Sequence, residues 1–238
     1  MKIIRQATHQ DHRQINALRI TEFQRSAQFT LLKPEMLLWN RFDDDAVVLS
    51  AWDGPCAVAT MRAVVVHCLS EAESCVQCRV PKDVALPAMV FNNAATRLEY
   101  RGLGLNQLLR YYFLKIALDN RIQSLLSPMY DGAPRIRFMQ ALGYEFSTPL
   151  RSWQKKLSPK AIRILGVLAR AKMPHARAYI ETHRREIIET YLWKGAPVLF
   201  ESRNCAAPAR KSDLQLVEKA MPMMSARLKN AAAGTHNR

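Results

Sequence analysis

Two hydrophobic periods alternate along the first two thirds of the chain: a period of two, typical of strands, and a period of about 3.6, typical of helices. Residues 2–7 alternate and predict a short strand. Thr8 followed three residues later by Asp11 marks the start of a helix, because such a pair satisfies free N–H groups and complements the helix dipole. Residues 46–52 and 56–67 predict the two strands of a hairpin.

The clearest helix of the chain begins just after a pair of glycines. Residues 105–117 place apolar side chains at i, i+3, i+4 and i+7, which is the pattern of a helix with one buried face. A predicted strand at residues 88–96 leads into this region, and a compact apolar strand at residues 122–127 follows it. Residues 133–142 predict a further helix, for which Gly143 is a natural C-terminal cap.

The remaining segments carry weaker patterns. They predict a short helix from Lys33-Pro34-Glu35, a loop at residues 69–87, closing strands at residues 144–146 and 153–157, and helices at residues 157–173 and 178–193. Strands alternate with helices in the first part of the chain, and the later pattern is helical. We therefore expect an α/β domain over residues 1–157 and a basic, mainly helical extension over residues 158–238.

The composition is that of a soluble globular protein, with 49% hydrophobic and 23% charged residues. No apolar run approaches the roughly 20 residues that cross a bilayer, so no transmembrane segment is expected. The first residues, MKIIRQATHQDHRQ, are too polar for a signal peptide. The sequence therefore predicts a cytoplasmic protein.

The net charge of +15 is unevenly distributed. Residues 1–150 hold 17 Lys and Arg against 14 Asp and Glu, whereas residues 151–238 hold 18 against 6, a net charge of +12. Such a segment favours anionic partners: nucleic acid, an anionic membrane surface, an acidic carrier protein or a phosphorylated ligand. A solvated basic face explains the same charge equally well.

Five cysteines in a chain without an export signal argue against a disulfide framework. Cys75 and Cys78, with His67 and Cys68 upstream, are residue types that bind zinc. Only one CxxC pair is present, however, and adjacent His and Cys residues in a strand would point to opposite faces. Reduced cysteines near a hairpin are the preferred interpretation, and no metal site is expected.

The stretch EYRGLGLNQLLR, residues 99–110, has the features of a phosphate site. Gly102 and Gly104 precede a helix, and backbone N–H groups at a helix N-terminus bind pyrophosphate well. A P-loop would need a Lys-Ser/Thr pair after its last glycine, and none is present. A dinucleotide fingerprint would need a third glycine where Gln107 stands. What remains is a strand, the pattern Arg-x-x-Gly-x-x, and a helix.

This pattern, at residues 101–106, resembles the acyl-CoA pyrophosphate loop of the GNAT superfamily of N-acetyltransferases, Gln/Arg-x-x-Gly-x-Gly/Ala. Glu99-Tyr100 matches the common lead-in of that loop, and the predicted order of elements over residues 1–157 is the order of the family. Residues 5–8 resemble its first strand, and residues 137–144 (RFMQALGY) resemble the end of its last helix. The resemblance implies the acyl-CoA N-acyltransferase (GNAT) fold, a mixed and mostly antiparallel sheet flanked by helices.

The resemblance also implies a chemistry in which the protein mainly positions a thioester for direct attack by an amine. Acetyl-CoA, or another acyl-CoA, would be the co-substrate, and the acceptor amine would belong to a small molecule or a protein. The fourth strand would contact the pantetheine arm and the thioester, and the glycine loop would hold the pyrophosphate. The residues so implied are Asn93 and Thr96 on the strand and Arg101, Gly102, Leu103, Gly104, Leu105 and Asn106 on the loop.

Two positions depart from the pattern of the family. Asn106 stands where Gly or Ala is usual, so its side chain either caps the helix or crowds the phosphate. Met139 stands where many relatives have the tyrosine that reprotonates the leaving thiolate. Tyr130, just after the predicted fifth strand, is the candidate substitute acid. No carboxylate except Glu99 lies near the end of the fourth strand, so a water relay or a neutral amine is considered in place of a base.

The sequence leaves three functions open, of which the first is preferred. The first is N-acetyl transfer from acetyl-CoA. The second is transfer of a longer acyl group from long-chain acyl-CoA or from an acyl carrier protein, which the basic segment would suit. The third is a non-catalytic module of the same fold whose basic C-terminus binds nucleic acid or a membrane. Arg135 and Arg137, in the last matched helix, either contact an acidic acceptor or the donor phosphates, or form a solvated face.

Overall fold

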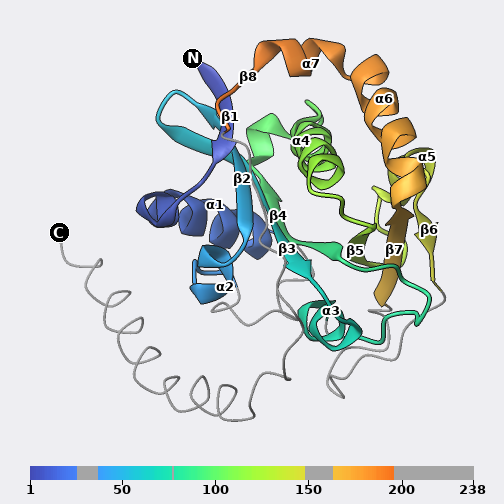
Figure 1. The fold of residues 1–238 in the computed structure, drawn as a ribbon. Helices are drawn as coiled ribbons and strands as arrows, with labels where there is room; N and C mark the ends of the chain where they lie inside the picture. Colours follow the sequence, from blue (N-terminus) through green and yellow to red (C-terminus); the bar gives the residue numbers. More distant parts are fainter. Residues whose placement is uncertain (26–36, 77, 148–162, 196–238) are drawn as a thin grey trace, which may run out of the picture. The chain divides into compact units, whose positions relative to one another are not determined.

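The computed structural model describes residues 1–25, 37–76, 78–147 and 163–195, which belong to one compact unit built around a single sheet (Figure 1). The strands are β1 (Lys2–Gln6), β2 (Val47–Asp53), β3 (Cys56–Val66), β4 (Ala88–Thr96), β5 (Ser124–Tyr130), β6 (Glu145–Phe146), β7 (Arg163–Ala169) and β8 (Leu192–Trp193). The helices are α1 (His12–Gln24), α2 (Arg41–Asp44), α3 (Leu69–Val76), α4 (Leu105–Asp119), α5 (Ile136–Ala141), α6 (Met173–His183) and α7 (Arg185–Thr190). Short 3-10 helices at His9–Asp11, Leu98–Tyr100 and Arg170–Lys172 precede α1, α4 and α6.

The sheet is mixed, with the strand order β6-β7-β5-β4-β3-β2-β1-β8. All neighbouring strands are antiparallel except two pairs, β4 with β5 and β1 with β8, which are parallel. Helix α4 connects the parallel strands β4 and β5, as a crossover connection between such strands requires. A mostly antiparallel sheet flanked by helices confirms the predicted fold class.

The helices cover both faces of the sheet (Figure 1). Helices α1, α2 and α3 lie on one face, where Ile15 and Leu18 of α1 pack with Val48 and Trp52 of β2. Helix α4 lies on the other face and packs against β2, β3 and β4, so that its apolar side chains join Met61 of β3 in the largest buried cluster. The central strands are therefore buried on both sides.

The first helical segment begins where the sequence predicts it. The Thr8 N–H donates a hydrogen bond to Asp11 Oδ2 at 2.9 Å, and the two residues form a capping box. Arg5 of β1 donates two hydrogen bonds to the same carboxylate, at 2.7 and 2.8 Å. Because these bonds favour the charged form, Arg5 lowers the pKa of Asp11. The ion pair joins the end of β1 to the start of the helical segment.

Helix α4 is buried on nearly all sides, with ten of its 15 residues inside the protein. The sheet covers the face that the apolar period predicted, and α6 covers the side of α4 that a one-sided amphipathic helix would leave to water. Tyr111 shows this contact directly, since its hydroxyl donates a hydrogen bond to Glu181 of α6 at 3.4 Å. The polar residue Arg110 is buried with the rest of the helix.

The prediction of a helix at residues 157–173 is wrong over Arg163–Ala169, because this stretch is strand β7. β7 lies between β6 and β5 and pairs with β5 along the full length of both strands. Ile164 and Leu168 are buried on the α4 face, and Leu165 is buried on the α3 face. A strand covered on both faces does not need alternating polarity, so its apolar residues imitated helical spacing.

The chain after β7 crosses the α4 side of the sheet and returns to the opposite edge, as the orange segment of Figure 1 shows. We call residues 170–193 the strap. Within it α6 packs against α4, and β8 pairs with β1, where Ile3 is opposite Leu192. The helix predicted at residues 178–193 is therefore two helices followed by a short strand. The strap lies beyond the predicted boundary at residue 157, which itself falls outside the described residues.

One further prediction is wrong and two lie outside the described residues. Leu69–Val76 form helix α3 within the predicted loop 69–87, where Ala72 and Val76 pack against β3 and β4. Eight residues with small apolar side chains carry too short a period to be recognised. The predicted helix from Lys33 and the predicted strand at residues 153–157 are not among the described residues. None of the helices in the described part of the chain has the length and apolar character needed to span a bilayer.

Candidate functional site

The parallel strands β4 and β5 pair over only three residues and then separate. Their pairs run from Ala88 opposite Ser124 to Val90 opposite Leu126. Beyond this point β4 continues to Thr96 beside β3, whereas β5 continues beside β7. We call the parting C-terminal ends of the two strands the β4–β5 opening. Ligands of α/β proteins commonly bind at such strand ends.

β4 is irregular within this opening. Asn93 and Ala94 together face a single residue of β3, Met61, which is the definition of a β-bulge. Asn93 has a φ angle of 49°, in the left-handed region that asparagine tolerates better than most residues. The bulge therefore distorts β4 beside the place where β5 leaves it.

The glycine loop connects the C-terminal end of β4 to α4. Gly102 and Gly104 have φ angles of 81° and 86°, which glycine adopts without steric cost. Gly104 is the N-cap of α4, and its carbonyl accepts the first helical hydrogen bond from the Leu108 N–H at 2.9 Å. The N–H groups of Leu105 and Asn106 precede that bond and have no acceptor within the helix. They lie at the positive end of the helix dipole, which favours an anion.

Arg101 uses its side chain for contacts within the protein. Its Nη2 donates a hydrogen bond to Glu22 of α1 at 2.8 Å, and its Nε donates to the Thr96 carbonyl at 3.3 Å. The ion pair with the buried Glu22 carboxylate joins the loop to α1. Leu103 is 55% exposed, whereas Leu105 is buried in the core. The loop therefore offers a ligand mainly its backbone.

The side chain of Asn106 resolves one of the alternatives left open by the sequence. Its Oδ1 accepts a hydrogen bond from Arg110 Nε at 3.2 Å, one helical turn further along α4. It does not cap the helix, because Gly104 occupies the N-cap position and no side chain forms a capping hydrogen bond there. Asn106 instead helps to orient Arg110.

Arg110 is a residue of this region that the sequence reasoning missed. It is 3% exposed and extends from α4 to the sheet just beyond the last pair of β4 and β5. Its Nη1 donates to Ser127 Oγ of β5 at 3.1 Å and to the Tyr144 hydroxyl at 3.5 Å. Its guanidinium carbon lies 5.1 Å from the ring centre of Phe91 on β4. Arg110 therefore contacts both strands where they part.

A second arginine, Arg135, directly precedes α5 and is affected by the charge of Arg110. Burial lowers the pKa of Arg110. Arg135 is an exposed residue, but protein groups around its guanidinium and the charge of Arg110 lower its pKa to about 10. Burial also raises the pKa of Tyr144, against the opposing effect of Arg110. Arg110 therefore places a buried guanidinium at the β4–β5 opening, and its charge acts on Arg135.

In the sequence, Met139 stands in place of the usual tyrosine and Tyr130 is its candidate substitute. These two residues lie on different sides of the sheet. Ser127 and Met129 of β5 face α4, so alternation places Tyr130, the last residue of the strand, on the other face. Met139 is completely buried in α5, where it packs in the core. The hydroxyl beside Arg110 belongs to Tyr144 and not to Tyr130.

A buried ionic network lies on the opposite face of β3 and β4. Asp43 of α2 pairs with Arg19 of α1 at 2.7 Å and with Arg62 of β3 at 3.2 Å. The side chains of Arg19 and Asp43 are fully buried. Arg62 Nε donates to Asn92 Oδ1 of β4 at 2.6 Å. The network therefore joins α1 and α2 to β4 next to its bulge, and no short motif in the sequence indicated it.

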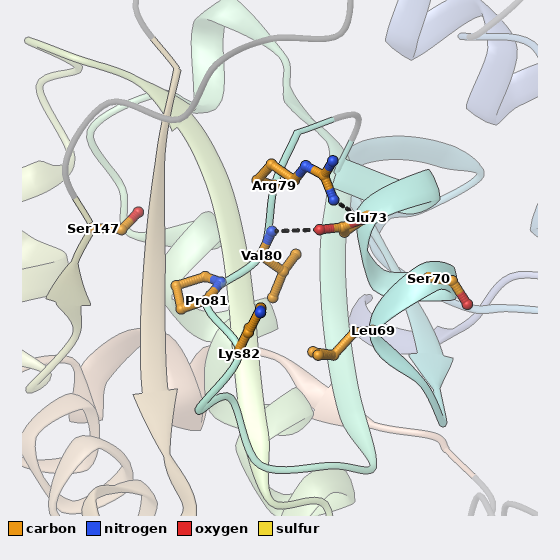
Figure 2. Close-up of a pocket in the computed structure, with 8 residues that line it drawn as sticks. All are labelled: Leu69, Ser70, Glu73, Arg79, Val80, Pro81, Lys82 and Ser147. Atoms are coloured by element: carbon orange, nitrogen blue, oxygen red, sulfur yellow. Dashed lines mark hydrogen bonds and ion pairs between the residues drawn. The ribbon is translucent and has the colours of Figure 1, made fainter.

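A pocket lies apart from this region, beside α3 (Figure 2). Within it Glu73 pairs with Arg79 at 3.6 Å and accepts a hydrogen bond from the Val80 N–H at 3.3 Å. The other lining residues are Leu69, Ser70, Pro81, Lys82 and Ser147. The residues implied in acyl-CoA binding are not part of this lining.

The alternative zinc site gains no support from the geometry. Among the residues that the structure describes, which include His67, Cys68, Cys75 and Cys78, no three His, Cys, Asp or Glu side chains are grouped to hold a metal ion. Cys75 lies in α3, where burial raises the pKa of its thiol. Such a thiol is less reactive than an exposed one.

Solved structures of the same fold share little sequence with this chain. BjaI, a CoA-dependent acyl-homoserine lactone synthase solved with SAM and isopentyl-CoA, is 16% identical over 83% of this chain and 95% of its own, with a TM-score of 0.55. FeeM, an N-acyl amino acid synthase from uncultured soil microbes, is 12% identical over 76% and 98%, with a TM-score of 0.53. A ribosomal-protein-alanine N-acetyltransferase from Brucella melitensis is 17% identical over 70% and 99%, with a TM-score of 0.52. Neither a family model nor a curated protein sequence matches the chain.

These similarities define the class of fold. The chain has the GNAT fold, which confirms the resemblance carried by the glycine loop and the last matched helix. The sheet order, the three-residue pairing of β4 with β5 and the glycine loop before α4 are the parts of that fold nearest to the candidate site.

Proposed function

We propose that the protein is an N-acyltransferase that takes its acyl group from an acyl-CoA. One observation carries this proposal: β4 and β5 part beside the glycine loop, at the N-terminus of α4. A thioester held in the β4–β5 opening and a pyrophosphate held on the loop can then belong to one molecule. Among proteins of the same fold, BjaI was solved with an acyl-CoA.

The local geometry supports a set of proposed contacts. Backbone N–H groups of residues 101–106 would hold the pyrophosphate, since the side chain of Arg101 is already paired with Glu22. Asn93 and Thr96 of β4 would lie along the pantetheine arm. The bulge at Asn93 leaves β4 irregularly paired, so its backbone groups are candidates for contacts with that arm.

The proposed reaction is direct attack of an amine on the thioester. The amine nitrogen bonds to the carbonyl carbon, the carbon–sulfur bond breaks, and an amide and a thiolate result. The nitrogen loses one proton and the thiolate gains one. We propose Tyr130 as the donor to the thiolate, with water or an already neutral amine in place of a protein base.

The acyl donor proposed from the sequence is acetyl-CoA. A longer acyl group is the second candidate, because the similarity to BjaI and FeeM spans 83% and 76% of this chain, against 70% for the ribosomal-protein-alanine acetyltransferase. An acyl carrier protein is the alternative donor that the basic C-terminal segment would suit.

Donor binding is tested by thermal shift with CoA, acetyl-CoA, isopentyl-CoA, a long-chain acyl-CoA and an acyl carrier protein. Thiol release in the presence of a panel of amines then tests transfer. We expect stabilisation by at least one acyl donor and release of thiol only when an amine is present. If none of these donors stabilises the protein, the proposed function is wrong.

The loop is tested by Gly104→Glu, which places bulk and negative charge at the proposed pyrophosphate site. We expect donor binding to be abolished. Because Gly104 has a positive φ angle, the matched control is Gly54→Glu, at a hairpin turn with φ of 57° and open space around it. The control carries similar backbone strain but should bind the donor normally. Unchanged affinity in the loop variant would refute the placement of the pyrophosphate.

A further inference from the structure

The buried arginines have two different kinds of hydrogen-bond partner, a carboxylate or neutral acceptors. Three arginines are buried in the described part of the chain: Arg19, Arg62 and Arg110. The first two share the carboxylate of Asp43. Arg110 instead donates only to neutral acceptors among the described residues, and no described Asp or Glu forms an ion pair with it. The charge of Arg110 also acts on Arg135, which has the same sign, and contributes to lowering the pKa of that guanidinium.

An arrangement of this kind is unfavourable for the protein by itself. A buried charge costs several kcal/mol unless an opposite charge offsets it. Hydroxyl and amide acceptors compensate only partly, and a second guanidinium nearby adds repulsion. An anion bound between Arg110 and Arg135 would offset both costs at once. The two arginines would therefore be stabilised when a ligand supplies the missing negative charge.

The position of Arg110 indicates which part of a ligand it would meet. It stands six positions after Gly104, so it lies about 9 Å along α4 from the end that would hold the pyrophosphate. It contacts Phe91 of β4 and Ser127 of β5, where the thioester region of a donor would lie. With the donor phosphates on the glycine loop, as proposed above, an anion beside Arg110 would be a second anionic group.

We propose that Arg110 and Arg135 bind a carboxylate of the substrate at the β4–β5 opening and so select for acidic substrates. A carboxylate is small and planar, and it accepts paired hydrogen bonds from a guanidinium. It comes from one of two sources: an amino acid as acceptor, or an acyl group that ends in a carboxylate. This inference rests on the proposed function, because it names the substrate class of the same site.

Both sources are tested on the wild-type protein with pairs of compounds, each consisting of an acid and a neutral analogue. For the donor, the affinity for succinyl-CoA is compared by calorimetry with the affinity for butyryl-CoA, which has a methyl group in place of the carboxylate. For the acceptor, kcat/KM with acetyl-CoA is compared between the proteinogenic α-amino acids and their α-amides. We expect the acid of one pair to be preferred by about tenfold or more, as loss of a charge-assisted bond predicts.

Variants then assign the preference to the two arginines. Arg110→Gln and Arg135→Gln should each remove most of the preference for the acid, measured as the ratio between the values for the acid and for its neutral partner in the same variant. Arg110→Lys keeps the charge without the paired donors, so it should retain part of the preference. Arg137→Gln is the matched control for Arg135, because Arg137 is an exposed arginine of α5. It should leave the preference unchanged.

The outcomes separate the inference from the proposed function. If acyl-CoA binds but neither pair shows a preference, the carboxylate site is wrong and the proposed function stands. If Arg110→Gln weakens the binding of CoA itself as much as that of the acidic partner, the arginine contacts the donor phosphates and the inference is again wrong. Failure of every acyl-CoA to bind the wild type overturns both.

Discussion

At the scale of single residues, the region around the candidate site is determined by buried charged side chains and by the partners that each of them has. Asp43 lies between Arg19 and Arg62, and this arrangement connects three elements that are distant in the sequence. Arg110 fills a similar position on the other face of the sheet without a carboxylate from the described residues. The first network therefore contains its own counter-charge and is structural. At Arg110 a ligand can supply the counter-charge that the described residues do not provide.

The structural network predicts a large effect for Asp43→Asn. This variant leaves two buried guanidinium groups without a counter-charge, so it should lower the free energy of unfolding by about 3–5 kcal/mol. Chemical denaturation measures the loss. The control is Asp45→Asn, an exposed residue two positions away, which should change stability by less than about 0.5 kcal/mol. Equal effects of the two variants would mean that the network is not a source of stability.

The residues of the site were predictable from the sequence only where the backbone requires a particular residue. Gly102 and Gly104 were recognised because two glycines one residue apart precede a helical pattern, and both adopt positive φ angles that favour glycine. Arg110 was missed, although Asn106, Arg110 and Phe113 follow each other at i, i+4 and i+7 along α4. That spacing would have placed Arg110 beside the apolar face, but it does not show what the arginine contacts, because Ser127 and Tyr144 come from later segments.

At the scale of elements, the first strand and helix were predicted correctly because their signals are local. Thr8 and Asp11 act within one turn, and Asp11 then binds Arg5 six residues earlier. β7 was predicted as a helix because its burial depends on α4 and α3, which the local period does not encode. The packing of α6 was not predictable for the same reason, because its partner α4 ends 54 positions before α6 begins.

The junction of β1 with the first helical segment predicts a pH effect. The Arg5 contact lowers the pKa of Asp11 in the folded protein, so the carboxylate stabilises the fold above its unfolded pKa. This contribution is lost as the pH falls through the folded value. The difference in unfolding free energy between wild type and Asp11→Asn should be constant above about pH 5 and shrink below about pH 4. Asp83→Asn, at an exposed site, should show no such trend.

The strap brings a basic side chain to the N-terminus of α4. Arg184, between α6 and α7, donates from Nε to Gln107 Oε1 in the first turn of α4, and its side chain lies next to Gly104. If a pyrophosphate binds there, Arg184→Gln should weaken donor affinity by about threefold to tenfold, because a charge-assisted contact is lost. Calorimetry with acetyl-CoA measures the change. The neighbouring Arg185→Gln removes the same charge from an exposed pair with Glu189 and should have little effect.

At the scale of the whole molecule, the strap joins the two edges of one sheet to its α4 face. It leaves β7, passes α4 and ends in β8 beside β1, so residues near position 192 pair with residues near the start of the chain. Residues 163–195 hold 7 Lys and Arg against 3 Asp and Glu, a net charge of +4. These residues, which include β7 and the strap, therefore carry about a third of the +12 charge of residues 151–238.

This charge distribution predicts how the choice of donor responds to salt. An acidic acyl carrier protein would dock through surface charges, which are screened as the Debye length shortens from about 14 Å at 0.05 M salt to about 5 Å at 0.4 M. Its association rate should therefore fall by about tenfold or more over this range. Transfer from acetyl-CoA, which depends on close contacts at the loop, should change much less. Stopped-flow binding and thiol release measure the two effects, and a carrier protein whose association is insensitive to salt would exclude docking through the basic segment.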